Sequence, residues 1–433
     1  MALIDIKDRK KAKVVILVVM FIYAFYNSSY LQLTTPILAT MVSSVGYTDA
    51  SLANMIITIT SLSQIPAFII AAIIGQRIDK RRWIVACAVI FSAAGAATIV
   101  VASNIYLVLV CRAIVGFSSG MLVLFSVAIL PDFYEGRQLA TFTGIVLAGS
   151  GIWGFVEANV SAAVCAAFGW QASYLLYVYG LVPMILFVLF IPSKPYIDLQ
   201  ALATGGGADG AAGRVETADP GDDRHVPPMV IVYTLVVILV CCFIQTLWSN
   251  FSIWIQGDLG GTVVQAGLAS SFISLFTCAI RLLFGPIYNR LHHYAIHLDI
   301  AILFIGLLVA TQARSFPMVL VAGGCLGLAM GLIIPTTLRL ASETMPTNPV
   351  TAQSFVQAGV QLGLFISTFW RLLLNHLGDG SLHAAISQEV YFVAAFFVIA
   401  VIFTFVRTRR ASALAASAKS DKGSIRGESA KGE

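Results

Sequence analysis

Residues 229–250 read MVIVYTLVVILVCCFIQTLWSN, a stretch of 22 positions without a charged side chain. As a helix rising 1.5 Å per residue it reaches about 33 Å, close to the roughly 30 Å of a bilayer's hydrocarbon core. Backbone N–H and C=O groups in lipid need partners within the chain, and a continuous apolar run of this length provides them as a helix. The stretch therefore predicts a transmembrane helix.

Similar apolar runs recur along the whole chain. Of its 433 residues, 58% are hydrophobic and 11% are charged, against about 25% charged in soluble domains, so lipid must solvate most of this surface. The sequence predicts an all-α integral membrane protein with twelve transmembrane helices. They occupy residues 14–35, 53–75, 83–102, 105–130, 139–163, 172–192, 229–250, 263–284, 295–313, 316–340, 351–374 and 385–406.

One long polar segment divides the predicted helices into two groups of six. Residues 197–228 are rich in Gly, Pro and Asp, a composition that cannot build a core, so we expect a flexible cytoplasmic linker. Residues 1–196 then form an N-terminal six-helix bundle and residues 229–410 a C-terminal one. Residues 411–433 are rich in Ala, Ser and Lys and predict a disordered cytoplasmic tail.

The distribution of Lys and Arg predicts the orientation, because cytoplasmic loops retain these residues. With the N-terminus inside, 22 of the 26 Lys and Arg residues fall on the cytoplasmic side and two outside. This asymmetry supports twelve spans with both termini in the cytoplasm of a cell-membrane protein.

The two groups of helices share short motifs at one offset, which indicates an internal repeat. Residues 75–80 and 285–290 both begin with Gly and follow a predicted helix, 210 positions apart. A Gly-x-x-x-Gly motif at 116–120 returns at 327–331, after 211 positions. Small residues four apart let helix backbones approach closely, so packing alone also explains these glycines.

The loop after the second predicted helix is similar to a signature of the major facilitator superfamily. Its matching residues are Gly75, Asp79, Lys80, Arg81 and Arg82, although the residue pair that usually precedes the final basic residues is missing. The resemblance implies two pseudo-symmetric six-helix bundles that transport a solute by alternating access. It also implies that these five residues gate the cytoplasmic side, with Asp79 locking it closed.

Two further stretches resemble motifs of the same family. Arg112-x-x-x-Gly116 resembles the helix 4 motif, and residues 168–174 resemble the entry to helix 6, with Gln171 in place of an Arg. The Gly-rich run at 144–154 has no Pro, unlike the helix 5 signature of the family's proton-coupled exporters. The family implies that helices 1, 4, 7 and 10 line the cavity, with contributions from 5, 8 and 11.

Three ionisable side chains stand well within the predicted helices: Arg112, Glu157 and Arg281. Such groups are costly in lipid and usually face the bundle interior. Arg112 and Glu157 lie at similar depths below the outer ends of adjacent helices, so an ion pair is plausible. Our hypothesis is that Glu157 is a proton-binding or substrate-linked carboxylate whose pKa is tuned by Arg112. Arg112 could also hold an anionic group, and a static pair that fixes helix packing is the alternative. Arg281, near the cytoplasmic end of its helix, is assigned to gating rather than to substrate contact.

Polar and aromatic stripes on several predicted helices supply the remaining candidates for substrate contact, although core packing or an interfacial belt also explains any single Tyr or Trp. They are Tyr23, Asn27, Tyr30, Gln245, Trp248, Gln357 and Gln361.

These features favour a secondary transporter of a small organic solute over other membrane functions. The solute is an aromatic or amphipathic compound or an organic anion, and proton coupling is favoured through Glu157. A non-transporting sensor on the same fold remains the alternative, while an enzyme is disfavoured because no catalytic motif is present. We expect no cofactor, no metal site and no nucleic-acid partner, and we expect a monomer working in the bilayer.

Overall fold

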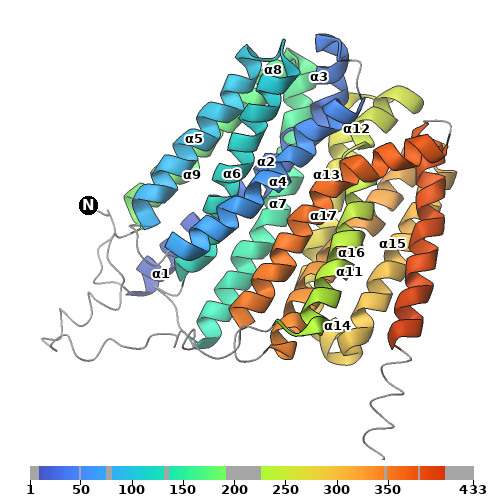
Figure 1. The fold of residues 1–433 in the computed structure, drawn as a ribbon. Coiled ribbons are helices and arrows are strands. Elements are labelled where there is room, and N and C mark those ends of the chain that lie inside the picture. Colours follow the sequence, from blue (N-terminus) through green and yellow to red (C-terminus); the bar gives the residue numbers. More distant parts are fainter. Residues whose placement is uncertain are drawn as a thin grey trace, which may run out of the picture.

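The computed structural model describes residues 9–47, 50–74, 80–130, 136–191, 226–345, 349–378 and 381–404, and these residues are almost entirely helical. Figure 1 shows the long helices running side by side as one bundle. We call the end of the bundle where the first helix begins and the last helix ends the terminal end, at the bottom of Figure 1, and the opposite end the distal end. The predicted linker up to residue 225, the predicted tail, Gly75 and Asp79 lie outside the described residues.

The N-terminal half contains six membrane crossings, of which the first and the sixth are segmented. The first consists of α1 (Arg9–Tyr23), α2 (Tyr26–Gln32), η1 (Thr35–Ile37) and α3 (Leu38–Val45). It is followed by α4 (Ala50–Ile74), α5 (Lys80–Val100), α6 (Ile105–Ala128) and α7 (Gly136–Phe168). The sixth consists of α8 (Trp170–Leu175), η3 (Leu176–Gly180) and α9 (Leu181–Phe190).

The C-terminal half repeats this arrangement. It contains α11 (Pro228–Trp248), continued by α12 (Phe251–Ile253) and a π-helical turn (Trp254–Asp258), and then α13 (Val263–Leu282). After α14 (Phe284–Leu291) and η5 (His292–Tyr294) come α15 (Ala295–Gln312), α16 (Phe316–Thr344) and α17 (Pro349–Leu377). A last helix covers Leu382–Thr404.

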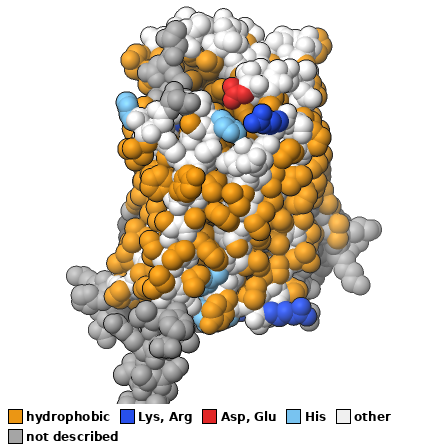
Figure 2. Space-filling model, turned by 90° about the vertical axis from the view of Figure 1, so that its right-hand side faces the viewer, with side chains coloured by type: hydrophobic (Ala, Val, Ile, Leu, Met, Phe, Trp, Pro, Cys, Tyr) orange, Lys and Arg blue, Asp and Glu red, His pale blue; other side chains and the backbone are white. Residues whose placement is uncertain are grey.

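Eleven helical segments in the described part of the chain are long and apolar enough to cross a membrane. Together with α17, which is equally long but carries Gln353, Gln357 and Gln361, they make the predicted twelve crossings. The face seen in Figure 2 is covered by hydrophobic side chains over its middle, with charged side chains near its two ends. The prediction of an all-helical membrane protein with two six-helix halves is confirmed.

The repeated Gly-x-x-x-Gly motif makes the same helix contact in both halves. A Cβ at Gly116 or Gly120 of α6 would collide with α4, at the Thr60 carbonyl and at Ala67 respectively. A Cβ at Gly327 or Gly331 of α16 would collide in the same way with the backbone of α13. The fourth crossing thus packs on the second, and the tenth on the eighth, through backbones that only glycine lets approach so closely.

The two halves meet along two helix pairs, α4 with α17 and α7 with α13. At the distal end the first and seventh crossings also join the halves by hydrogen bonds. The Ser252 hydroxyl donates to the Pro36 carbonyl at 2.7 Å and accepts from the Ala39 amide at 3.2 Å, and Thr40 donates to Gln256 at 2.9 Å. Asn54 of α4 donates to Asn250 at 3.2 Å. These bonds close the distal end.

Candidate transport cavity

A cavity of about 160 Å³ lies between the two halves. It extends from Arg281, in the last turn of α13, to a hydrogen bond that Gln32 of α2 donates to Ser274 of α13. Ser274 and Arg281 are seven positions apart along α13, so this side of the cavity is about 10 Å long. Its polar lining residues are Asn27, Ser28, Tyr30, Gln32, Gln64, Ser150, Trp248, Ser274, Thr277, Arg281, Gln357 and Gln361.

Five of the nine residues predicted to serve substrate or coupling lie in this lining: Asn27, Tyr30, Trp248, Gln357 and Gln361. The other four do not line it. Tyr23 is buried and donates from its hydroxyl to the Leu122 carbonyl at 3.1 Å, a packing role within the N-terminal half. Gln245 is buried in α11, and Arg112 and Glu157 lie within the N-terminal half.

Among the described residues that line the cavity, Arg281 is the one that carries a charge. The sequence predicts a gating role for it because it lies close to a helix end; the structure places it in the cavity lining, and the gating role stays a prediction. No hydrogen bond or ion pair joins its guanidinium to another residue of the described chain. The titratable groups near enough to interact with it are Tyr30 and Cys278, neither of which carries a charge at neutral pH. The cavity is therefore electropositive.

Several buried polar atoms of the lining also have no hydrogen-bond partner within the described chain. They are the amide oxygens of Asn27, Gln32 and Gln361 and the indole N–H of Trp248. Buried polar groups are nearly always paired, and each unpaired one costs about 1–3 kcal/mol. All four atoms are shielded from the cavity in the present side-chain conformations, so a polar ligand would satisfy them after rotation about the soft terminal torsions of these side chains.

Arg112 is fully buried in α6 and makes three hydrogen bonds, none of them to a carboxylate. Its Nε donates to the Ile56 carbonyl at 2.8 Å and one terminal nitrogen donates to the Tyr177 hydroxyl at 2.6 Å. The other terminal nitrogen donates to the Tyr30 carbonyl. This arginine thus ties the first, second, fourth and sixth crossings together.

A break in the first crossing explains why the Tyr30 carbonyl accepts this bond. The Thr34 amide bonds to the Leu31 carbonyl at 3.1 Å, and the Ile37 amide bonds to the Thr34 carbonyl at 3.2 Å. These tighter bonds, next to Pro36, leave the carbonyls of Tyr30 and Leu33 without their usual helical donors. Arg112 supplies one donor, and Ser161 of α7 supplies the other at 2.6 Å.

Glu157 lies in α7 and accepts a hydrogen bond from the Ser29 hydroxyl at 2.8 Å, while its second oxygen has no partner in the described chain. Both Glu157 and Arg112 lie in the described region, and they form no ion pair with each other. Each nevertheless contacts the first crossing at neighbouring positions, Glu157 at Ser29 and Arg112 at Tyr30.

The two side chains are nevertheless joined indirectly through the first crossing. Tyr177, which accepts from Arg112, donates to the Ser29 carbonyl at 3.2 Å, and the hydroxyl of the same serine donates to Glu157. A shift of Arg112 would therefore reach Glu157 by way of α2, not by direct charge interaction.

Three further charged side chains within the helices were not among the predicted residues: Asp299 of α15 and Glu389 of the last helix, which are buried, and Arg371 of α17, which is half-buried. The carboxylate oxygens of Asp299 and Glu389 have no hydrogen-bond partner that meets strict geometry in the described chain, although Trp370 and Thr246 lie close to Glu389. Asp299 and Glu389 lie within predicted spans, each four residues from its start, so an inspection of every acidic residue in a span would have found them. None of the three lines the central cavity.

The predicted gating residues are only partly described. Arg81 at the start of α5 donates to the Ile191 carbonyl at 3.0 Å and to the Val188 carbonyl, which ties it to the end of α9. Arg82 is exposed, and the side chain of Lys80 lies outside the described residues together with Gly75 and Asp79. The gating role of this loop stays a prediction.

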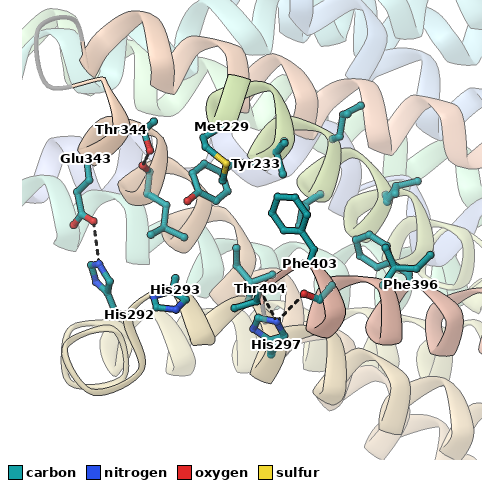
Figure 3. A pocket seen from close by; sticks show the side chains of 18 residues that line it. Met229, Tyr233, His292, His293, His297, Glu343, Thr344, Phe396, Phe403 and Thr404 are labelled. Atoms are coloured by element: carbon teal, nitrogen blue, oxygen red, sulfur yellow. Dashed lines mark hydrogen bonds and ion pairs between the residues drawn. The ribbon is translucent and has the colours of Figure 1, made fainter. Parts of the chain in front are cut away.

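A larger cavity, about 690 Å³, lies at the terminal end but is lined by the C-terminal half alone (Figure 3). His292 approaches Glu343 at 3.6 Å, and His297 lies 3.2 Å from the Ala400 carbonyl and 3.1 Å from the Thr404 hydroxyl. Because both halves must contact a solute for their relative motion to carry it, this cavity is a poor candidate for a transport path. No three His, Cys, Asp or Glu side chains of the described chain lie close enough together to hold a metal ion.

Comparisons with known proteins agree with this architecture. Similar solved structures include a bacterial homologue of the human lysosomal transporter Spinster in an inward-facing, occupied conformation, with 14% identity and a TM-score of 0.70 over 92% of this chain and 97% of that chain. They also include a mutant of the nucleoside transporter NupG, with 11% identity and a TM-score of 0.67 over 90% and 99%. Tetrameric PepTSo2 shows 14% identity and a TM-score of 0.69 over 92% and 99%.

A search of curated protein sequences finds no significant match. The sequence model of the Major Facilitator Superfamily matches residues 16–296 and 233–430, and so covers nearly the whole chain. With two six-helix halves around a shared cavity and a repeated helix contact in each half, this chain belongs to the major facilitator superfamily.

Proposed function

We propose that this protein is a secondary active transporter that moves a small organic solute by alternating access, coupled to protons, as a monomer in the cell membrane with both termini cytoplasmic. The observation that supports the proposal is the cavity between the halves, bounded on its distal side by hydrogen bonds that join them. With the termini cytoplasmic, this arrangement is a state closed to the outside.

The inter-half bonds are suited to opening and closing. They join neutral hydroxyl and amide groups, and a typical neutral hydrogen bond contributes about 0.5–1.5 kcal/mol. A seal of this kind can separate when contacts at the opposite end replace it. The resemblance of residues 75–82 to the family's gating loop assigns the opposite contacts to that loop.

Glu157 is the proposed proton site. Gly151 of α7 lines the cavity, Gly154 packs against the Gln32–Ser274 bond, and Glu157 follows one turn further toward the distal end. Opening of the distal seal would therefore expose Glu157 to the outside, whereas the present state buries it. Its oxygen without a partner provides a position for a proton. Protonation removes a buried charge, so a proton bound outside would favour the return of the carrier.

Proteoliposomes that enclose a pH-sensitive dye test this proposal. Members of a broad panel of small solutes are added, and any solute that moves with protons changes the internal pH. We expect Glu157→Gln to abolish the proton movement while exchange of the same radiolabelled solute continues. Glu343→Gln is the matched control, because this glutamate lies half exposed at the terminal end of α16.

Two results would contradict the proposal. Full proton movement in Glu157→Gln would exclude Glu157 as the coupling residue. If the vesicles contain folded protein and no member of the panel is transported, the non-transporting sensor would be favoured.

A further inference from the structure

Among the described residues that line it, the central cavity has one positively charged side chain and no negatively charged one, together with a set of unsatisfied acceptors. From this combination we propose that its ligand is a small hydroxylated monocarboxylate, with the carboxylate bound by Arg281. The identification of this ligand as the transported solute rests on the function proposed above.

The charge of the ligand follows from Arg281. A guanidinium inside a membrane protein is expensive unless it is paired, and this one has no hydrogen-bonding or ionic partner among the described residues. Its planar array of N–H donors fits a carboxylate in a bidentate manner. Because Arg281 is the one charged side chain in the lining, a single negative charge neutralises the site. A dianion would leave an uncompensated charge.

The hydroxyl groups follow from the unpaired atoms of the lining. The amide oxygens of Asn27, Gln32 and Gln361 each need a hydrogen-bond donor, and the Trp248 indole N–H needs an acceptor. A hydroxyl group serves both kinds of atom once the side chains rotate toward the cavity, from which all four atoms are shielded in the present conformations. An ammonium would also donate, but it would add a buried cation beside Arg281 with no carboxylate in the lining to balance it. Hydroxyls therefore fit the lining better than amines.

The size of the ligand follows from the cavity volume. The volume of about 160 Å³ is well below the roughly 300–1,000 Å³ of sites for drug-sized ligands. The apolar part of the lining is contributed by aliphatic side chains, among them Val123, Ile334 and Val360, and by the face of Trp248. A carbon skeleton of about two to six atoms suits this space.

A purely structural role for Arg281 makes a different prediction. Arg281 lies in the last turn of α13, where the helix dipole favours a cation whether or not a ligand binds. In that case any basic residue would serve, and the protein would not discriminate between ligands by their charge. Ligand binding therefore separates the two explanations.

The experiment measures binding to the purified full-length protein by calorimetry and by the shift of its melting temperature. The probes are hydroxylated monocarboxylates of two to six carbons, each compared with its neutral amide. Glycerate and its three relatives make the sharpest set: glyceramide lacks the charge, propionate lacks the hydroxyls and serine replaces a hydroxyl by an ammonium. We expect at least one hydroxylated acid to bind at least 10-fold more tightly than its amide, its deoxy analogue and its amino analogue.

Variants then assign the charge recognition to Arg281. We expect Arg281→Gln to lose the preference for acid over amide, and Arg281→Lys to keep part of it because the charge remains. Arg290→Gln, an exposed arginine outside the lining, should bind like the unmodified protein. The comparison of acid with amide needs no variant, so misfolding of one variant does not weaken the test.

The inference is overturned if no acid of the panel binds, if amides bind as tightly as acids, or if Arg281→Gln retains the preference. Its failure is distinguishable from failure of the proposed function. Selective acid binding without flux in vesicles would support the inference and reject transport, while flux of a neutral or cationic solute without acid binding would do the reverse.

Discussion

Each half of the molecule holds an arginine within its helices, fully buried in the N-terminal half and half-buried in the C-terminal half, and the two make different contacts. Arg112 of the N-terminal half donates to two backbone carbonyls and a tyrosine hydroxyl, and is sealed from the cavity. Arg281 of the C-terminal half lines the cavity and has no hydrogen-bonding partner in the described chain. A charged side chain inside the bundle therefore does not by itself identify a ligand site. Hydrogen-bond donors of that side chain that are left without a partner in the described chain do.

The largest effect should come from the close helix contact at the Gly-x-x-x-Gly motif, which occurs once within each half. Replacing Gly116 or Gly327 by Leu would drive a side chain into the backbone of α4 or α13, and overpacking of this kind costs about 1–3 kcal/mol or more. We expect both variants to lose most folded protein, measured by size-exclusion chromatography after membrane extraction. Gly285→Ala is the control, because nothing lies within 4 Å of a Cβ there. Tolerance of Leu in one half alone would show that the repeat does not pack symmetrically.

The next effect should separate the two arginines. Arg112→Gln leaves the carbonyls of Tyr30 and Ile56 without their donors, at about 1–3 kcal/mol for each buried unpaired group. We expect its melting temperature to fall by several degrees. Arg281→Gln removes a charge without breaking a hydrogen bond in the described chain, so its melting temperature should stay the same or rise. Equal losses in the two variants would remove the distinction between them.

A smaller effect is expected at the seam between the halves. Ser274→Ala removes the acceptor of the Gln32 hydrogen bond and should weaken distal closure by about 0.5–1.5 kcal/mol. Spin labels at Ser43→Cys and Gly257→Cys, on opposite sides of the seam, should then show a larger population at long distance. Ser271→Ala is the matched control, because this serine bonds within its own helix, to the Leu268 carbonyl. An unchanged distance distribution in Ser274→Ala would mean that this bond does not hold the distal end closed.

The smallest effect should come from a charge pair on the surface of the C-terminal half. Arg339 and Glu343 of α16 are four residues apart, with Nε and Oε1 at 3.1 Å and both side chains at least 40% exposed. Exposed pairs of this kind contribute about 0.3–0.5 kcal/mol. We expect Arg339→Gln to shift the melting temperature by about a degree or less and to leave binding of hydroxylated acids unchanged. A loss comparable to that of Arg112→Gln would show that exposed and buried arginines are equivalent here.

Much of the fold could be predicted because membrane insertion depends on composition over about 20 residues at a time. The predicted span 316–340 corresponds to α16, Phe316–Thr344, and the repeated glycines predicted a close helix contact in both halves. The end of α7 could not be placed, since the helix continues five residues beyond the predicted 163.

The site was predicted less well than the fold, for a physical reason. Asn27, Trp248 and Gln361 were found because polar side chains within a span point away from lipid. Gln64 and Ser274 also line the cavity and share this property, but they were not among the predicted residues. The sequence predicts a substrate or coupling role for Arg112. No sequence feature shows that its guanidinium already donates to the Ile56 and Tyr30 carbonyls and to the Tyr177 hydroxyl.

The sequence by itself determined that lipid surrounds this protein, how often the chain crosses it and that two related halves exist, because the cost of burying backbone and charge in hydrocarbon is local and additive along the chain. The tertiary structure alone decided which arginine faces the cavity. Hydrogen-bond satisfaction depends on groups that lie far apart in the sequence, such as Tyr30 and Tyr177 for Arg112, and folding alone brings them together.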